Sequence, residues 1–413
     1  MKIVFFNDTY HPYVSGVITA MERFAQGLHR RGHQVSMVVP GDTRSPMVEN
    51  VQELLSIPVP GFDGLRIGTP ILADGHLSLS GSLDRELDLV HAHSPFIVGR
   101  MGARLAEKRR IPLVFTCHSL YPNYSDYFPW ISDVAAEVIR EYVVDFCSYC
   151  DLVLAPSGPV KDTLQGWGVR SRIDVLPSGI DWEEIERARS LLTREVLAER
   201  RRQYQRTHGI PQSADLLLFV GRMDHRKNIS FLFSVLEALP GSRDVHLALI
   251  GDGPAKPRLE QLVRQRGLTE RVHFIGKMPF AGVIEWYHLA DLFCFPSLVE
   301  TQGLVLAESM GCGLPVVALD SPTSKEVVQP EVNGLLVKED PRAFADAVQG
   351  LLLSPEERAT MSVAARLTGK RFSLEPLTEE LASKYMEVIR RKRRLPRLRG
   401  WRMLGDWFDG SLS

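Results

Sequence analysis

Short apolar runs recur along the chain, and longer stretches with helical periodicity separate them. The run at 2–6 precedes a helical pattern over 17–31 that ends at Gly32, and a second apolar run follows at 34–39. The same alternation predicts further strands at 87–91, 113–116, 152–155, 173–176, 216–220, 245–250, 272–275, 292–295, 316–318 and 334–337. Strands that alternate with helices form parallel sheets with right-handed crossovers. The pattern therefore predicts an α/β fold with two doubly wound sheets in tandem.

The length of the chain predicts more than one domain. Its 413 residues exceed the ~250–300 residues at which single hydrophobic cores stop growing. We expect an N-terminal domain over 1–182 and a second domain over 183–371, which begins with a charged, helix-favouring linker. A third segment, 372–413, should form a terminal amphipathic helix over 377–394 that returns to the N-terminal domain, followed by a basic aromatic tail.

Composition narrows the class of protein. A hydrophobic content of 44% and a charged content of 24% are typical of globular proteins. The net charge of −1 gives no overall attraction to nucleic acid or membranes. Five cysteines, mostly in apolar runs, indicate a reducing compartment. Cys147 and Cys150 have the spacing of a metal or redox pair but lack a second pair, so we expect both to be buried.

The first residues, 1–6, are too short an apolar run for a signal peptide. No stretch approaches the ~20 apolar residues of a membrane span, so we expect a cytoplasmic protein.

The end of the chain combines basic residues with aromatic ones. Arg390–Arg394 is followed by further arginines and by Trp401, Trp407 and Phe408. Such a segment can bind an anionic phospholipid surface; the alternative is a solvated tail. A second basic stretch covers 100–110. Neither stretch belongs to a recognisable nucleic-acid fold, so we expect no nucleic-acid partner.

Two glutamates between predicted strands are the most informative candidates. Glu300 lies in the loop after the strand at 292–295, and Glu308 lies in a short helix over 303–311. Ligands bind at the carboxyl ends of strands in open α/β sheets. On one helix the pair would be about 12 Å apart, beyond the roughly 5–9.5 Å of a glycosidase pair. The spacing suits two anchors for one long ligand; taken alone, two solvated carboxylates are the simpler interpretation.

A basic loop follows the strand at 216–220. Gly221 begins it, and Arg222 and Lys227 precede a predicted helix at 229. Backbone N–H groups at a helix N-terminus favour an anion, and arginine and lysine both bind phosphate. The alternative is an exposed basic turn. Placement after a strand favours phosphate binding.

Other strand ends carry weaker candidates. The loop at 14–17 contains Ser15 and Gly16 and lacks the dinucleotide fingerprint; a tight turn and a ligand contact are equally good interpretations. His118 follows the strand at 113–116 and would point from the sheet's carboxyl edge. A lone histidine is more often structural than catalytic, but this position at a strand end favours a functional role. Gly251 lies in a glycine-rich turn after 245–250, for which a turn is the main interpretation and ligand contact is secondary.

Together these segments resemble the GT-B retaining glycosyltransferases of the family that includes sucrose synthase and the bacterial lipid glycosyltransferases. The similarity covers nearly the whole chain, through 15–16, 175–181, 221–227, 251–254 and 296–317. The resemblance implies two Rossmann-like domains and a nucleotide-sugar donor. Arg222 and Lys227 would then hold the donor diphosphate, Glu300 the hydroxyls of the sugar, and Glu308 the nucleotide ribose.

The resemblance also implies roles for the remaining candidates. Backbone N–H groups of Gln302, Gly303 and Leu304 would hold sugar or phosphate, and His118 would contact the sugar near the reacting carbon. Gly16, Gly221 and Gly251 would let the backbone approach the donor. Together with Ser15 they complete the expected donor site. Members of this family generally need no metal, so no metal or other cofactor is expected.

The segments 300–303 and 93–124 look most like bacterial diacylglycerol glucosyltransferases. That likeness implies transfer of a hexose, glucose in the first place with UDP-glucose as donor, to a membrane lipid such as diacylglycerol. Retention is expected, with the enzyme peripheral on the inner face of the cell membrane. The acceptor could instead be a phosphatidylinositol, a polyprenyl-linked glycan or a soluble sugar. A nucleotide-sugar 2-epimerase and a non-catalytic nucleotide-sugar sensor are the alternatives from other classes.

Overall fold

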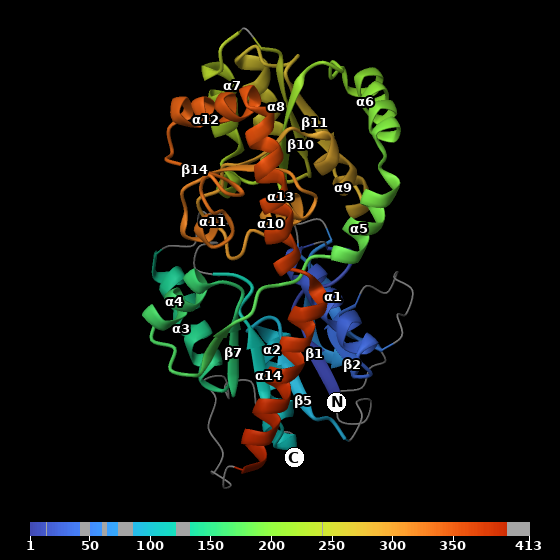
Figure 1. Ribbon diagram of the computed structural model, residues 1–413. Coiled ribbons are helices and arrows are strands. Elements are labelled where there is room, and N and C mark those ends of the chain that lie inside the picture. Colours follow the sequence, from blue (N-terminus) through green and yellow to red (C-terminus); the bar gives the residue numbers. More distant parts are fainter. Residues whose placement is uncertain are drawn as a thin grey trace. The chain divides into compact units, whose positions relative to one another are not determined.

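The computed structural model describes residues 1–13, 15–41, 50–59, 64–72, 86–120, 133–241 and 243–394 (Figure 1). The chain divides into two compact units. Unit 1 comprises Met1–Gly179 and Leu374–Ser413, and unit 2 comprises Ile180–Ser373. Each unit is built on one sheet with helices around it, which confirms the predicted α/β fold with two Rossmann-like sheets.

The sheet of unit 1 has the strand order β4-β3-β2-β1-β5-β6-β7-β8. Its strands are β1 (Lys2–Phe6), β2 (Gln34–Pro40), β3 (Val51–Pro58), β4 (Arg66–Leu72), β5 (Leu89–Ala92), β6 (Leu113–Thr116), β7 (Leu152–Ala155) and β8 (Ile173–Val175). All neighbours are parallel except β3 and β4. The strand order reverses between β1 and β5, which is where ligands bind in such sheets.

The antiparallel pair β3–β4 was not predicted. Uniformly apolar runs predict strands that are buried on both faces. In β3 the only buried residue is Leu54, and Ile57, opposite Ile67 of β4, is largely exposed. A half-exposed edge strand gives a weaker signal, so the two strands were missed.

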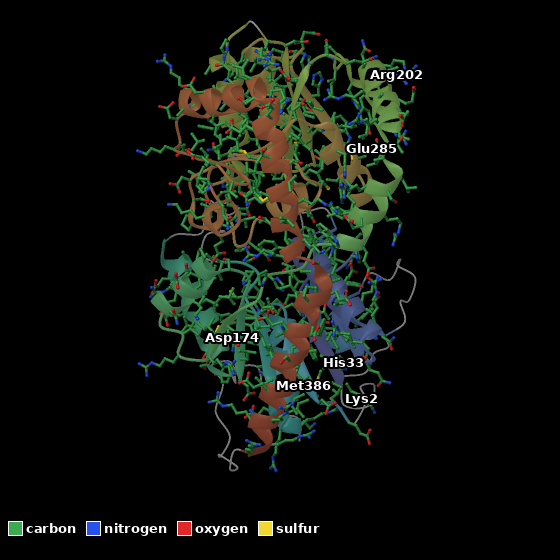
Figure 2. The ribbon with its side chains drawn as sticks, in the orientation of Figure 1. Lys2, His33, Asp174, Arg202, Glu285 and Met386 are labelled. Carbon is green, nitrogen blue, oxygen red and sulfur yellow. The ribbon has the colours of Figure 1, made fainter. Side chains whose placement is uncertain are left out.

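Helices of unit 1 are α1 (Gly16–Arg30), α2 (Ile97–Arg109), α3 (Asp133–Ser148), α4 (Gly158–Gly166) and α14 (Leu374–Arg394). The terminal helix α14 runs along this unit beside α1 (Figure 1). Leu381 and Tyr385 of α14 are buried in one cluster with Phe5 of β1. At its edge Lys384 binds Asp174 at 3.0 Å, and Figure 2 shows Asp174 on this unit. Burial and ion pairing thus attach α14 to unit 1.

The sheet of unit 2 has six parallel strands in the order β11-β10-β9-β12-β13-β14. They are β9 (Asp215–Val220), β10 (Val245–Ile250), β11 (Val272–Gly276), β12 (Leu292–Phe295), β13 (Val316–Leu319) and β14 (Gly334–Val337). The strand order reverses between β9 and β12. Buried aromatic and aliphatic side chains cover both faces of this sheet.

Helices of unit 2 are α5 (Trp182–Leu191), α6 (Arg194–His208), α7 (Ile229–Ala238), α8 (Lys256–Gln265), α9 (Phe280–Leu289), α10 (Leu304–Gly311), α11 (Pro322–Val327), α12 (Pro341–Leu353) and α13 (Pro355–Arg371), with the 3₁₀ turn η2 (His225–Lys227). The predicted linker therefore forms α5 and α6. Its Tyr204 stacks on Trp286 of α9, with ring centroids 4.3 Å apart, and hydrogen-bonds to Glu285, which Figure 2 labels. The linker is thus a packed part of unit 2.

The cysteines lie in apolar surroundings. Cys147 and Cys150 are buried, as predicted, and the five cysteines are free. Across the described ranges, no helix combines the length and apolar character needed to span a bilayer.

Candidate functional site

Four loops of unit 2 meet at one edge of its sheet. They follow β10, β9, β12 and β13, which are neighbours and parallel, so their carboxyl ends lie side by side. The loop residues include most of the predicted donor site: Gly221, Arg222, Lys227, Gly251, Glu300, Gln302 and Gly303. The fold therefore gathers on one edge residues that are up to about eighty positions apart in the sequence.

An ion pair bridges the point where the strand order reverses. The ammonium of Lys227, after β9, binds the carboxylate of Glu300, after β12. The two side chains are 22% and 14% exposed. Because both charges have lost most of their water, each depends on the other for compensation. A lysine and a carboxylate are thus held close to the place where parallel sheets bind ligands.

Local capping holds Lys227 in place. The turn η2 begins at the buried Asp224, whose Oδ1 accepts a hydrogen bond from the Arg226 N–H at 3.0 Å. It is capped at its other end by Asn228, which has a left-handed φ of 51° and donates from Nδ2 to Glu339 at 3.1 Å. Asparagine tolerates this backbone conformation better than most residues. The turn is therefore fixed at both ends, with Lys227 as its last residue.

Thr323 holds the backbone of Glu300. Its hydroxyl donates to the Glu300 carbonyl oxygen at 2.8 Å, and its side chain is buried at the start of α11. Thr323 was not among the residues predicted from the sequence. Its position shortly after the strand β13, at the same sheet edge, is the signal that could have found it.

The glycine-rich turn after β10 supports the basic loop. Gly251 has a φ of +132°, and a Cβ on it would lie 2.0 Å from the carbonyl oxygen of Gly221. Next to it the Met223 N–H donates to the Asp252 carbonyl at 2.9 Å. Only glycine allows such close backbone contact. This geometry gives Gly251 a clear task as a spacer beneath the 221–223 segment.

The helix after Glu300 starts and ends where the sequence predicts. Gly303, with a φ of +67°, caps α10, and Leu304 is its first residue. Glu308 lies inside this helix and is only 9% exposed. The simpler interpretation of Glu300 and Glu308 as two solvated surface carboxylates is therefore wrong: Glu300 is ion-paired with Lys227 in a loop, and Glu308 is buried in a helix.

Ser15 and Gly16 begin the first helix of unit 1. The Ser15 hydroxyl accepts a hydrogen bond from the Ile18 N–H at 3.4 Å and so caps α1. A Cβ on Gly16 would meet no atom within 4 Å. Packing within the described chain therefore does not require glycine here, and the absence of a side chain leaves the space beside the α1 N-terminus open.

His118 is hydrogen-bonded to a second histidine. It follows β6, and its Nε2 lies 2.9 Å from Nδ1 of His93, which follows β5. Both side chains are buried, and burial lowers the pKa of each ring, that of His118 to about 4. Both imidazoles are therefore neutral at pH 7. His93 was not among the predicted site residues, although it too lies just after a predicted strand.

A third histidine and a carboxylate complete this edge of unit 1. His91 lies between the hydroxyls of Tyr385, at 2.5 Å, and Thr116, at 2.7 Å. Asp8, after β1, accepts hydrogen bonds from the Ser94 hydroxyl at 2.5 Å and the Val98 N–H at 2.8 Å. Burial raises the Asp8 pKa, and these hydrogen bonds oppose the rise. Asp8 thereby caps α2 and links the loops after β1 and β5.

Two protein-family models match this chain. A family model described as Glycosyltransferase Family 4 matches residues 14–184, and one described as Glycosyl transferases group 1 matches residues 200–368. The two models together span most of the chain. The protein belongs to the GT-B glycosyltransferases.

Relatives of this glycosyltransferase differ in their named activities. The alpha-monoglucosyldiacylglycerol synthase of Acholeplasma laidlawii is 25% identical, over 94% of this chain and 98% of its own length. The synthase of the same name from Streptococcus pneumoniae is 27% identical, over 86% and 79%. A D-inositol 3-phosphate glycosyltransferase of Xylanimonas cellulosilytica is 29% identical, over 89% and 90%.

Solved structures show the same fold. Sucrose-phosphate synthase of Thermosynechococcus elongatus matches with a TM-score of 0.75 and 22% identity, over 94% of this chain and 99% of that one. The Anabaena protein HepE in complex with UDP-glucose matches with a TM-score of 0.72 and 20% identity, over 94% and 100%.

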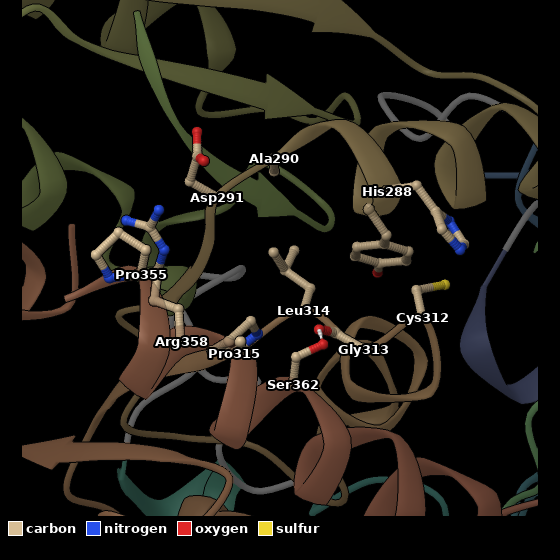
Figure 3. A pocket seen from close by; sticks show the side chains of 12 residues that line it. His288, Ala290, Asp291, Cys312, Gly313, Leu314, Pro315, Pro355, Arg358 and Ser362 are labelled. Carbon is tan, nitrogen blue, oxygen red and sulfur yellow. Dashed lines mark hydrogen bonds between the residues drawn. The ribbon is translucent and has the colours of Figure 1, made fainter. Parts of the chain in front are cut away.

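A pocket of about 350 Å³ lies at the other edge of the unit 2 sheet (Figure 3). Its lining includes Asp291, just before β12, and Leu314, just before β13. Asp291 accepts the Leu216 N–H at 2.8 Å, and Ser362 donates to the Gly313 carbonyl at 2.6 Å. These polar groups serve the fold, and the pocket lies away from the carboxyl-edge loops of the glycosyltransferase.

No set of three or more histidine, cysteine, aspartate or glutamate side chains in the described part of the chain could hold a metal ion. That the enzyme needs no metal stays a prediction from the family resemblance.

Proposed function

We propose that this glycosyltransferase moves a hexose, glucose in the first place, from a nucleoside diphosphate sugar to a membrane lipid such as diacylglycerol, with retention of the anomeric configuration. Binding of a nucleoside diphosphate sugar is supported by the ion pair of Lys227 and Glu300, which lies where the strand order of unit 2 reverses. A lysine beside a diphosphate would stabilise the negative charge that develops as the nucleotide leaves.

The neighbouring groups suit the rest of such a donor. Glu300 would accept hydrogen bonds from sugar hydroxyls once Lys227 turns to phosphate, and Arg222 from the same loop would grip the diphosphate. Buried Glu308 on α10 would bind the ribose, and the backbone of 302–304 at the α10 N-terminus would help hold the sugar or a phosphate. In unit 1, the family resemblance would give Gly16 a backbone approach to the diphosphate and His118 a contact with the sugar; a Cβ on Gly16 would meet no described atom within 4 Å.

Lipid acceptors are favoured by the named activities of the relatives. Two are alpha-monoglucosyldiacylglycerol synthases, matched over most of both chains. A second candidate uses a phosphorylated inositol as acceptor, as the name of the inositol phosphate enzyme indicates. A mannose donor is the corresponding alternative to glucose, because another relative, 25% identical, is named a GDP-mannose-dependent alpha-mannosyltransferase.

Product analysis tests the proposal. The full chain is incubated with UDP-glucose or GDP-mannose, each with diacylglycerol, phosphatidylinositol, inositol phosphate or a polyprenyl phosphate in mixed micelles. We expect an α-glucosyl diacylglycerol from UDP-glucose, identified by mass and by the anomeric proton coupling. A β-linked product would contradict retention, and transfer only to an inositol acceptor would replace the lipid assignment.

The same assay separates the other classes. An epimerase would invert C2 of the donor sugar without any acceptor, and a sensor would bind the donor without turnover. Either result would reject the transferase proposal.

Basic residues gather at the amino edge of the unit 1 sheet. At the end of α14, Lys392 binds Asp151 just before β7 at 2.9 Å, and Arg393 lies 3.6 Å from Asp88 just before β5. The C-terminus of α2, with exposed Lys108 and Arg110, precedes β6 at the same edge. Within the other basic stretch Arg100 faces elsewhere, because it pairs with Asp145 at 2.9 Å. We include in the proposal that this edge contacts anionic lipid at the inner face of the membrane.

Vesicle binding tests the membrane contact. The variant replaces three exposed arginines by glutamine: Arg390, Arg391 and Arg394. At about 1 kcal/mol per basic residue near an anionic surface, we expect roughly 100-fold weaker binding to vesicles rich in phosphatidylglycerol. The matched control replaces three basic residues of α8 in the same way: Lys256, Arg258 and Arg264. Equal binding of both variants and the unmodified chain would refute this surface; the residues after Arg394 lie outside the described part of the chain.

A further inference from the structure

One hydrogen bond ties the protonation of His93 to that of His118. Their Nδ1 and Nε2 atoms are 2.9 Å apart. A neutral imidazole carries one proton, on either nitrogen. Since the shared bond holds a single proton, both rings must adopt the same tautomer: either both carry hydrogen on Nδ1 or both carry it on Nε2.

The surroundings of His93 favour one of these arrangements. Its Nε2 is buried and has no hydrogen-bond partner in the described part of the chain. If His118 donated, this Nε2 would carry an orphaned N–H; if His93 donates, it is a bare acceptor. Orphaned buried N–H groups are rarer than under-used acceptors. The geometry therefore favours donation from His93 Nδ1–H, with His118 protonated on Nδ1.

Packing keeps the His93 ring in this orientation. Its centroid lies 4.7 Å from Phe5 and 4.1 Å from His91, and it stacks on His118 at an interplanar angle of 17°. His91 is itself fixed between two hydroxyl groups, those of Tyr385 and Thr116. Because each neighbour is held, Nδ1 of His93 stays directed at His118 and the hydrogen bond is preorganised.

We propose that His93 is a positioning residue that holds His118 in its Nδ1–H tautomer, so that His118 offers a hydrogen-bond donor to a substrate oxygen. This inference rests on the proposed function, in which His118 contacts the sugar. No described residue hydrogen-bonds to His118 Nδ1, and His118 follows β6 at the carboxyl edge of the sheet. In the opposite tautomer the same nitrogen could only accept, and the ring and ester oxygens of a donor sugar cannot donate to it.

Two substitutions at His93 separate positioning from packing. His93→Asn keeps a donor at the δ position, whereas His93→Phe keeps a ring of similar size without a donor. We expect the Asn variant to retain kcat within a few-fold, and the Phe variant to lose roughly 10- to 100-fold, the range for groups that orient a functional imidazole. The KM for the donor should change less than kcat. Stability should follow the opposite order, because Phe fills the buried site and Asn leaves a cavity.

The diagnostic result is that the two variants rank oppositely in kcat and in stability: the Asn variant should be the more active one and the Phe variant the more stable one. A purely structural role would make Phe the better-tolerated residue in activity as well as in melting temperature. If the Phe variant keeps full kcat, or if activity simply follows stability, the proposal is wrong.

A spectroscopic measurement tests the tautomer without substrate. Imidazole ¹⁵N shifts of the histidine-labelled full chain should show His118 protonated on Nδ1 in the unmodified protein and in His93→Asn. In His93→Phe the population with hydrogen on Nδ1 should fall, because no donor then holds His118 Nε2 as an acceptor. Finding Nε2–H in the unmodified protein would overturn the inference. Absence of sugar transfer with every donor and acceptor would instead reject the proposed function, while the ¹⁵N result would still decide whether His93 sets the tautomer.

Discussion

Replacing Lys227 by methionine is expected to lower kcat for sugar transfer roughly 100- to 1000-fold, the typical cost of removing one preorganised group that stabilises developing charge. Methionine keeps the apolar stem and removes the ammonium. Because the charge on the leaving nucleotide grows toward the transition state, the loss should fall on kcat more than on KM. Steady-state kinetics with the radiolabelled donor measures both constants.

The control for this variant is a matched ion pair at the other edge of the same sheet. Arg243, before β10, binds Asp215 at the start of β9 at 2.8 Å. Arg243→Met removes a partly buried cation from unit 2 as Lys227→Met does, so any effect of lost pairing on stability should be similar. We expect its kcat to stay within about two-fold of the unmodified enzyme. A normal kcat for Lys227→Met, or an equal loss in both variants, would remove Lys227 from the donor site.

The loops at the carboxyl edge of the unit 2 sheet could be predicted because short sequence patterns mark them. Glycine, proline and the change from apolar strand to loop mark both the basic loop before α7 and the segment that contains Glu300. The meeting of Lys227 with Glu300 follows once β9 and β12 are neighbours. That adjacency is a property of the strand order, which a single sequence does not contain.

The contacts of His93 and Thr323 could not be predicted from local patterns, because they join residues that are far apart in the sequence. His93 and His118 meet because β5 and β6 pair in a register that places His91 beside Val114. Thr323 reaches Glu300 from a short helix more than twenty residues later. Applying the strand-end argument to every polar residue, and not to His118 alone, would have identified both His93 and Thr323 as candidates.

The substitution Gly251→Ala is expected to destabilise unit 2 by roughly 3 kcal/mol, from a strained backbone together with overpacking. Its φ of +132° is unfavourable for any residue with a side chain, and the new Cβ would lie 2.0 Å from the Gly221 carbonyl oxygen. Relief of that contact must move the 221–223 segment, which precedes Lys227. We therefore expect a lower urea midpoint and loss of transfer activity in the same variant.

Gly350 provides a control, because replacing it by alanine shows how the free energy of unfolding changes at a position where no other backbone lies near. Gly350 is inside α12, and a Cβ there meets nothing within 4 Å. Gly350→Ala should be neutral or stabilise the protein by up to about 1 kcal/mol. The comparison also separates two roles for Gly251. A glycine that only touched the donor would raise KM when replaced and leave the urea midpoint unchanged, whereas a spacer beneath the basic loop must lower both stability and kcat. An unchanged midpoint for Gly251→Ala would therefore contradict the spacer role.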